Sequence, residues 1–117
     1  MTEELNDHGA QIFTCPSCDG PLRVTADGRF QCEVGHRYAL ESALRQDGEN
    51  VTRALMRAVD SLRNRAAMSR WAARNPDVYR RLDADAQRAS ATVDDEMAEV
   101  LLAHARVLDP SVGGAGW

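Results

Sequence analysis

The chain has 117 residues, of which 44% are hydrophobic and 5% aromatic, and its formal net charge at pH 7 is −4. This length predicts one domain near the lower end of the usual size range, and the acidic balance argues against general electrostatic attraction to nucleic acid or anionic membranes. Because small apolar residues make a thin core, we expect the fold to need a stabilising cross-link or a partner.

The first residues, "MTEELNDHGA", are polar and acidic, which is not the pattern of a signal peptide. No apolar run approaches the roughly 18 residues of a membrane span. We therefore expect a cytoplasmic protein without a membrane segment, in which thiols stay reduced. Residues 1–11 show no periodicity and are expected to form a disordered tail.

Residues 12–39 contain all three cysteines and are rich in glycine and proline. Within them "LRV", "TADG" and "RFQC" predict two short strands around an Asp-Gly turn. This segment is therefore expected to be a small, loop-rich β unit at the start of a mostly helical chain.

The cysteines and one histidine follow the pattern C-x2-C-x13-C-x3-H, formed by Cys15, Cys18, Cys32 and His36. Three thiolates and an imidazole complete the tetrahedral shell of one structural Zn²⁺. The predicted hairpin would bring the two ligand pairs together. We expect Gly20 and Gly35 to adopt positive φ, so that backbone N–H groups point at the sulfurs.

Other interpretations of the cysteines fit less well. A disulfide would leave an odd cysteine, and a thioredoxin-type pair needs a strand followed by a helix. A DNA-reading finger needs its last ligands on a helix, whereas Gly35 interrupts them here. A catalytic zinc needs an open coordination position. Since no nucleophile–base set appears either, we expect no enzymatic activity and no small-molecule substrate.

Residues 40–108 predict an antiparallel pair of long helices. In the first helix, an apolar stripe recurs at spacings of three and four, at Val51, Leu55, Val59, Leu62, Ala66 and Ser69. "RNPD" ends that helix, and Pro76 is expected in the first turn of the second. The apolar side of the second helix is predicted at Val78, Leu82, Ala86, Ala89, Val93, Met97, Val100, Leu101, His104 and Leu108. Residues 109–117 are expected to be a flexible tail that ends in Trp117.

Charge is distributed unevenly along this helical region. Residues 53–81 carry eight arginines and two aspartates, whereas residues 82–117 carry seven acids and two arginines. We expect Arg53 and Arg57 to lie beside the acids at positions 94–99, which would favour the antiparallel pairing modestly. The tip of the hairpin also presents a candidate partner-binding surface, formed by Arg70, Trp71, Arg74, Arg80 and Arg81.

The segments "FTCPSCDGPL" and "FQCEVGHRYALESAL", followed by a helix pair, resemble the C-terminal zinc-ribbon extension of some chemotaxis methylesterase-like proteins. The resemblance spans roughly residues 12–105, and C-x-V-G-H-x-Y is its most specific part. It implies that Cys15, Cys18, Cys32 and His36 are the metal positions, and that the bacterial module is accessory or regulatory. The methylesterase catalytic domain is absent, so no esterase activity is implied.

Two functions remain open from the sequence. The first is a regulatory protein-interaction module, in which a zinc ribbon anchors a helical hairpin that binds a protein partner or forms a homodimer. Apolar stripes wider than one seam, including Met56 and Leu101, favour such association. The alternative is a small zinc protein that binds nucleic acid or the ribosome through the arginine-rich tip.

Overall fold

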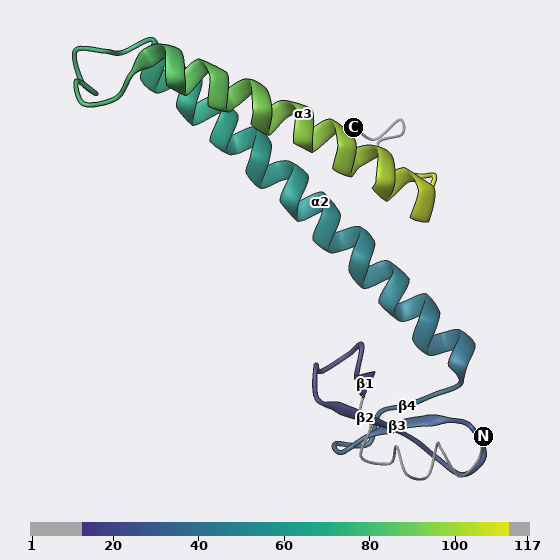
Figure 1. Cartoon of the computed structure of the whole chain (residues 1–117). Coiled ribbons are helices and arrows are strands. Elements are labelled where there is room, and N and C mark those ends of the chain that lie inside the picture. Colours follow the sequence, from purple (N-terminus) through teal and green to yellow (C-terminus); the bar gives the residue numbers. More distant parts are fainter. Residues whose placement is uncertain (1–12, 113–117) are drawn as a thin grey trace. The chain divides into compact units, whose positions relative to one another are not determined.

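The computed structural model describes residues 13–112, which form a small antiparallel sheet followed by two long helices (Figure 1). This architecture, mostly α with a small β ribbon, confirms the fold class predicted from the sequence. The chain divides into two compact units, one ending at Asn50 and the other beginning at Val51. In the described part of the chain, neither helix has a stretch that is long and apolar enough to cross a membrane.

The sheet has four strands in the order β1-β2-β3-β4: β1 Phe13–Thr14, β2 Pro21–Val24, β3 Phe30–Cys32 and β4 Arg37–Tyr38. Strands β2 and β3 are the predicted hairpin, and Leu22 lies opposite Cys32 in their register. The short edge strands β1 and β4 were not predicted. Pairing through β1 and β4 places Cys15 just after one sheet edge and His36 just before the other.

The core of the ribbon is small. Cys15, Leu22 and Cys32 are buried, and Phe30 and Tyr38 pack against them. So few apolar side chains leave the fold short of stabilising contacts, which is the condition in which a metal contributes most.

Helix α2 spans Leu40–Ala73 without interruption, and Gly48 and Asn50 lie within it. The first turns of α2, up to Asn50, belong to the same compact unit as the sheet, which we call the ribbon unit. There the Asn50 side chain donates a hydrogen bond of 2.9 Å to the carbonyl oxygen of Pro16, in the first cysteine knuckle. The ribbon unit therefore contains helix as well as sheet.

Helix α3 spans Ala84–Leu108, so the prediction that it begins at Pro76 was wrong. The carboxylate of Asp83 accepts hydrogen bonds from the backbone N–H groups of Asp85 and Ala86 and caps the helix. Upstream, the N–H groups of Val78 and Tyr79 donate to the carbonyl of Asn75 and close a turn. The proline therefore begins a turn in the connection rather than a helix.

Alanines fill the seam between the two helices. The buried residues are Val59, Ala66 and Ala73 on α2, and Ala91, Asp94, Ala98, Leu102 and Ala105 on α3. The predicted α2 stripe is correct in its buried members, Val59 and Ala66. On α3 the prediction is correct at Leu101, which packs partly against the seam. It was wrong at Val93, Met97, Val100, His104 and Leu108, which are all exposed.

Ion pairs across the seam accompany this rotation of α3. Its acids face the arginines of α2, in the pairs Arg63–Glu99 (3.2 Å), Arg65–Asp94 (3.3 Å) and Arg70–Asp95 (2.6 Å). Opposite charges therefore meet across the seam, as predicted. The α2 partners lie further along than Arg53 and Arg57, because the connection extends to Asp83 and the hairpin folds later in the chain.

Beyond α3, Val112 packs against the seam at Val59, Ala98 and Leu102. The start of the segment predicted as a C-terminal tail is thus in contact with the helices. The predicted tail at residues 1–11 and Trp117 lie outside the described residues.

Candidate metal centre

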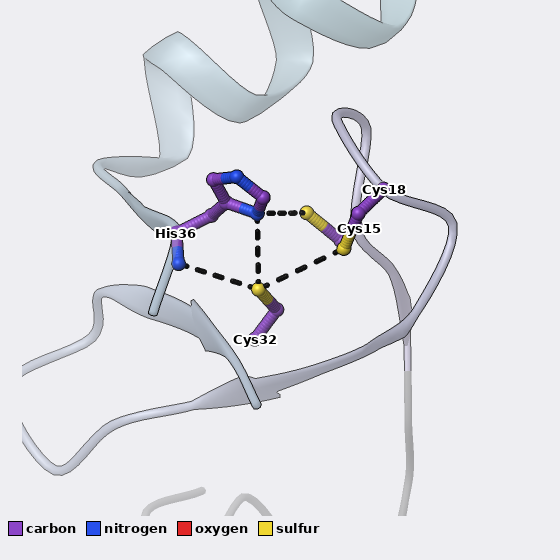
Figure 2. Close-up of side chains that lie close together, drawn as sticks. All are labelled: Cys15, Cys18, Cys32 and His36. Carbon is purple, nitrogen blue, oxygen red and sulfur yellow. Dashed lines mark hydrogen bonds between the residues drawn. The ribbon is translucent and has the colours of Figure 1, made fainter. Parts of the chain in front are cut away.

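The four predicted ligands converge at one end of the ribbon (Figure 2). Their candidate ligand atoms all lie within 4.8 Å of one another, and the residues are Cys15, Cys18, Cys32 and His36. Cys15 and Cys32 are buried, Cys18 is exposed, and His36 is half-buried. All three thiols are free, so none is committed to a disulfide.

The distances in the cluster match those around a tetrahedral zinc ion. Zn–S bonds of about 2.3 Å and Zn–N bonds of about 2.0 Å imply separations of about 3.8 Å between sulfurs and about 3.5 Å between sulfur and nitrogen. The sulfurs of Cys18 and Cys32 are 3.9 Å apart. His36 Nδ1 lies 3.6 Å from the sulfur of Cys15 and 3.2 Å from that of Cys32. Figure 2 shows this ring nitrogen facing the sulfurs, so the residues fit a zinc ion bound through Nδ1.

Each cysteine knuckle contains one residue of positive φ. In the second knuckle it is Gly35, with φ 102°, as predicted. In the first it is Asp19, with φ 64°, and not Gly20. Gly20 instead brings the backbone close to the metal site, because a Cβ there would lie 3.4 Å from the sulfur of Cys18.

These knuckles direct backbone N–H groups at the sulfurs. The N–H of Ser17 donates to the sulfur of Cys15 at 3.5 Å, and the N–H of His36 donates to that of Cys32 at 3.3 Å. A zinc site with three thiolates and a neutral imidazole has a formal charge of −1. The N–H dipoles offset that negative charge.

The same contacts govern protonation of the thiols. Burial raises the pKa of Cys15, but hydrogen bonds from the N–H groups of Ser17 and Cys18 outweigh it and lower that pKa to about 6. Burial also raises the pKa of Cys32, yet N–H donors and the His36 ring leave it below its usual value. The backbone is therefore arranged to hold thiolates, the form that binds a metal.

The exposed thiol behaves differently. The N–H of Gly20 lowers the pKa of Cys18, but burial and the sulfurs of Cys15 and Cys32 raise it above its usual value. Negative charge thus accumulates among the three sulfurs, and a divalent cation would neutralise it. Hydrogen bonds to the sulfurs of Cys32 and Cys15 raise the pKa of His36 for the same reason.

A hydroxyl pair covers one side of the cluster. Tyr38 packs on the ribbon core, and its hydroxyl lies 3.9 Å from the sulfur of Cys15. That hydroxyl also shares a hydrogen bond with Ser17. The contribution of Ser17 was missed from the sequence, because only the folded knuckle brings it next to Tyr38.

The predicted partner surface at the hairpin tip is not a single patch. Trp71 stacks edge-on against Tyr79, with ring centres 5.5 Å apart, and both line an apolar hollow with Met68 and Leu82. Arg70 and Arg74 line a different hollow with Arg88. The remaining two predicted residues, Arg80 and Arg81, are exposed in the connection between the helices.

Comparison with protein families, curated proteins and solved structures finds no match to this chain. The cluster of three cysteines and one histidine therefore carries the functional argument.

Proposed function

We propose that this protein is a non-enzymatic interaction module whose fold is held by one structural Zn²⁺. The observation that carries the metal assignment is the convergence of Cys15, Cys18, Cys32 and His36 within 4.8 Å. Thiolate and imidazole ligands in a tetrahedral arrangement suit Zn²⁺ better than the oxygen-preferring Mg²⁺ or Ca²⁺. The same set of free thiols fits a reducing compartment, and we therefore place the protein in the cytoplasm.

A structural role follows from the ligand count. Four protein ligands fill the tetrahedral shell and leave no position for a reacting water or substrate. The proposed zinc would connect the two knuckles, and so both edges of a sheet whose own core is small. We expect no hydrolase or esterase turnover from this centre.

The interaction role is inferred from the helical unit. Its seam is built mainly from alanines, while larger apolar side chains such as Val93, Val100 and Val107 stay exposed. An exposed apolar face of this kind is typical of protein–protein association. The resemblance to the extension of chemotaxis methylesterase-like proteins agrees with a bacterial regulatory module, and we propose that role for the chain.

Binding of nucleic acid is less well supported. Arg63, Arg65 and Arg70 pair with acids of α3, which reduces the positive charge available to a phosphate backbone. We therefore favour a protein partner for the helical unit.

The metal assignment is tested by metal analysis of the full chain, followed by exchange into Co²⁺. We expect about one zinc per chain and, with cobalt, the absorption of a tetrahedral site with thiolate ligands. Cys18→Ser should lose the metal or change the spectrum, whereas Ser111→Ala, outside the ribbon, should change neither. Less than half an equivalent of zinc, or an octahedral cobalt spectrum, would contradict the assignment.

A further inference from the structure

The three sulfurs of the metal centre differ in how far solvent reaches them. Cys15 is 0% exposed and Cys32 4%, and both belong to the core of the ribbon. Cys18 is exposed, together with its neighbours Ser17 and Asp19 at the tip of the first knuckle. A reagent in solution can therefore reach one sulfur of the cluster directly, and the other two only when the ribbon opens.

Gly20 leaves one side of the exposed sulfur uncovered. A Cβ at this position would lie 3.4 Å from the sulfur of Cys18, in van der Waals contact with it, and would screen part of its surface. Hydrogen bonds also cover this sulfur least. Two backbone N–H groups donate to Cys15 and two to Cys32, whereas among the described residues Cys18 receives one, from Gly20.

A bound metal would make access the deciding property. A cysteine binds zinc as the thiolate, so all three sulfurs of the loaded site are deprotonated. The thiolate is also the form of the side chain that acts as a nucleophile. All three sulfurs then have the reactive charge, and the one that solvent reaches is Cys18.

A second thiol lies within reach of Cys18. The sulfurs of Cys18 and Cys32 are 3.9 Å apart and face one another (Figure 2). They would have to approach by about 2 Å to form a disulfide bond. Because Cys32 is buried, an oxidant in solution does not reach it, but it is placed to attack Cys18 once Cys18 has been oxidised.

We propose that Cys18 is a peroxide-reactive site, and that its oxidation ends in a disulfide between Cys18 and Cys32 and in release of the zinc ion. The proposal rests on the structural zinc proposed above and adds a chemical signal that removes it. Each chain reacts once, so the centre acts as a target of peroxide and not as a catalyst.

The reaction has two steps. In the first, the Cys18 thiolate attacks one oxygen of hydrogen peroxide, the O–O bond breaks, and the products are a sulfenic acid on Cys18 and hydroxide. In the second, the Cys32 thiolate attacks the sulfur of Cys18, the S–S bond forms, and a second hydroxide leaves. Two electrons pass from the two thiolates to the peroxide. Only Cys15 and His36 then remain as ligands, which are too few to retain the metal.

The first test is competitive alkylation of the full, zinc-loaded chain, after metal analysis has established its zinc content. A substoichiometric amount of N-ethylmaleimide should modify Cys18 at least about tenfold more than Cys15 or Cys32, as read from peptide fragment masses. In urea with a chelator the three thiols should react alike, because the fold no longer distinguishes them. Equal labelling in the loaded chain would overturn the proposal and leave the metal assignment intact. A chain that holds no zinc would contradict both.

The second test is oxidation by hydrogen peroxide. The loaded chain should release about one zinc, recorded with a chromogenic chelator, as its mass falls by about 2 Da on formation of one disulfide. Peptide mapping should place that disulfide between Cys18 and Cys32, and a thiol reductant with added zinc should restore the centre. Zinc that stays bound after Cys18 is oxidised, or a disulfide that involves Cys15, would overturn the proposal.

Two variants test the point of attack. Gly20→Ala retains all four ligands and should slow alkylation and zinc release by about threefold or more, because the added methyl group screens the sulfur. Gly48→Ala, where a Cβ meets nothing within 4 Å, is the matched control and should react like wild type. Cys18→His replaces the reactive sulfur by a nitrogen ligand, and its zinc should be released by peroxide at least about tenfold more slowly. Release as fast as in wild type from Gly20→Ala or from zinc-loaded Cys18→His would overturn the assignment of Cys18.

Discussion

At the scale of single residues, the conformation of Gly35 is a sensitive part of the ribbon. Its φ of 102° is a backbone conformation that side chains with a Cβ rarely adopt, although nothing crowds the position itself. We predict that Gly35→Ala lowers the free energy of unfolding of the ribbon by about 1–2 kcal/mol and weakens zinc retention. Competition with a chromogenic chelator would measure the affinity.

Gly48 provides the matched control for this substitution. It lies within α2, again with open space where a Cβ would stand, and it has no positive φ. Gly48→Ala should therefore stabilise the protein by about 0.5–1 kcal/mol. Equal effects of the two substitutions would show that backbone conformation at Gly35 is unimportant.

Asp94 is a buried carboxylate in a seam of alanines. Its Oδ2 atom lies 3.3 Å from Arg65 Nε but accepts no hydrogen bond from any described residue. We predict that Arg65→Ala destabilises the hairpin by about 1 kcal/mol, a modest value because the arginine is largely exposed. In an Asp94→Ala background the same change should cost almost nothing.

A double-mutant cycle in urea measures this coupling. Thr92→Ala, at an exposed position on the same helix, serves as a background in which the cost of Arg65→Ala should persist. A cost that is the same with and without Asp94 would show that the ion pair does not contribute to stability.

At the scale of the elements, the alanine seam limits what the helices tolerate. Ala98 is 1% exposed, so Ala98→Leu must displace its neighbours. We predict a loss of about 1–3 kcal/mol in the free energy of unfolding. Ala103→Leu, on the exposed side of α3, should be within about 0.5 kcal/mol of wild type. Thermal unfolding of the two variants decides between a packed seam, which predicts this difference, and a loose one, which does not.

The elements also show what the sequence could predict. The four residues of the candidate metal centre were identified because few other roles suit the spacing of Cys15, Cys18, Cys32 and His36, with a turn between the two pairs. The helical hairpin was found from periodicity and from the break near Asn75. The start of α3 was misplaced because Pro76 and Asp83 are both helix-start signals, and only the folded turn at residues 75–79 distinguishes between them.

The face of α3 could not be predicted in the same way. Apolar periodicity selects the stripe with the largest side chains, which is the one centred on Val100. The seam instead uses Ala91, Ala98 and Ala105, and in this rotation the acids of α3 pair with arginines of α2. Which charges pair depends on where the hairpin turns. The sequence pattern alone therefore identifies two apolar faces on α3 but does not show which of them packs against α2.

At the scale of the whole molecule, the two compact units should respond differently to metal removal. Ligation and folding are coupled in small zinc units, and the ribbon has few other contacts to hold it. We predict that a strong chelator removes amide-exchange protection from residues 13–50 first. Most of the helical circular dichroism should remain, because α3 and the rest of α2 lie in the other unit.

Adding zinc back should restore protection in the ribbon, and adding Mg²⁺ should not. Simultaneous loss of protection in both units would show that they fold as one cooperative body.

The alanine seam also has a consequence for how such a chain can diverge. Positions 59, 66 and 73 of α2 and 91, 98 and 105 of α3 recur every seven residues and are all buried, and five of these six are alanine. Substitutions at the alanine positions are restricted to residues of similar size. Related sequences should therefore conserve the small size of these side chains rather than their hydrophobicity.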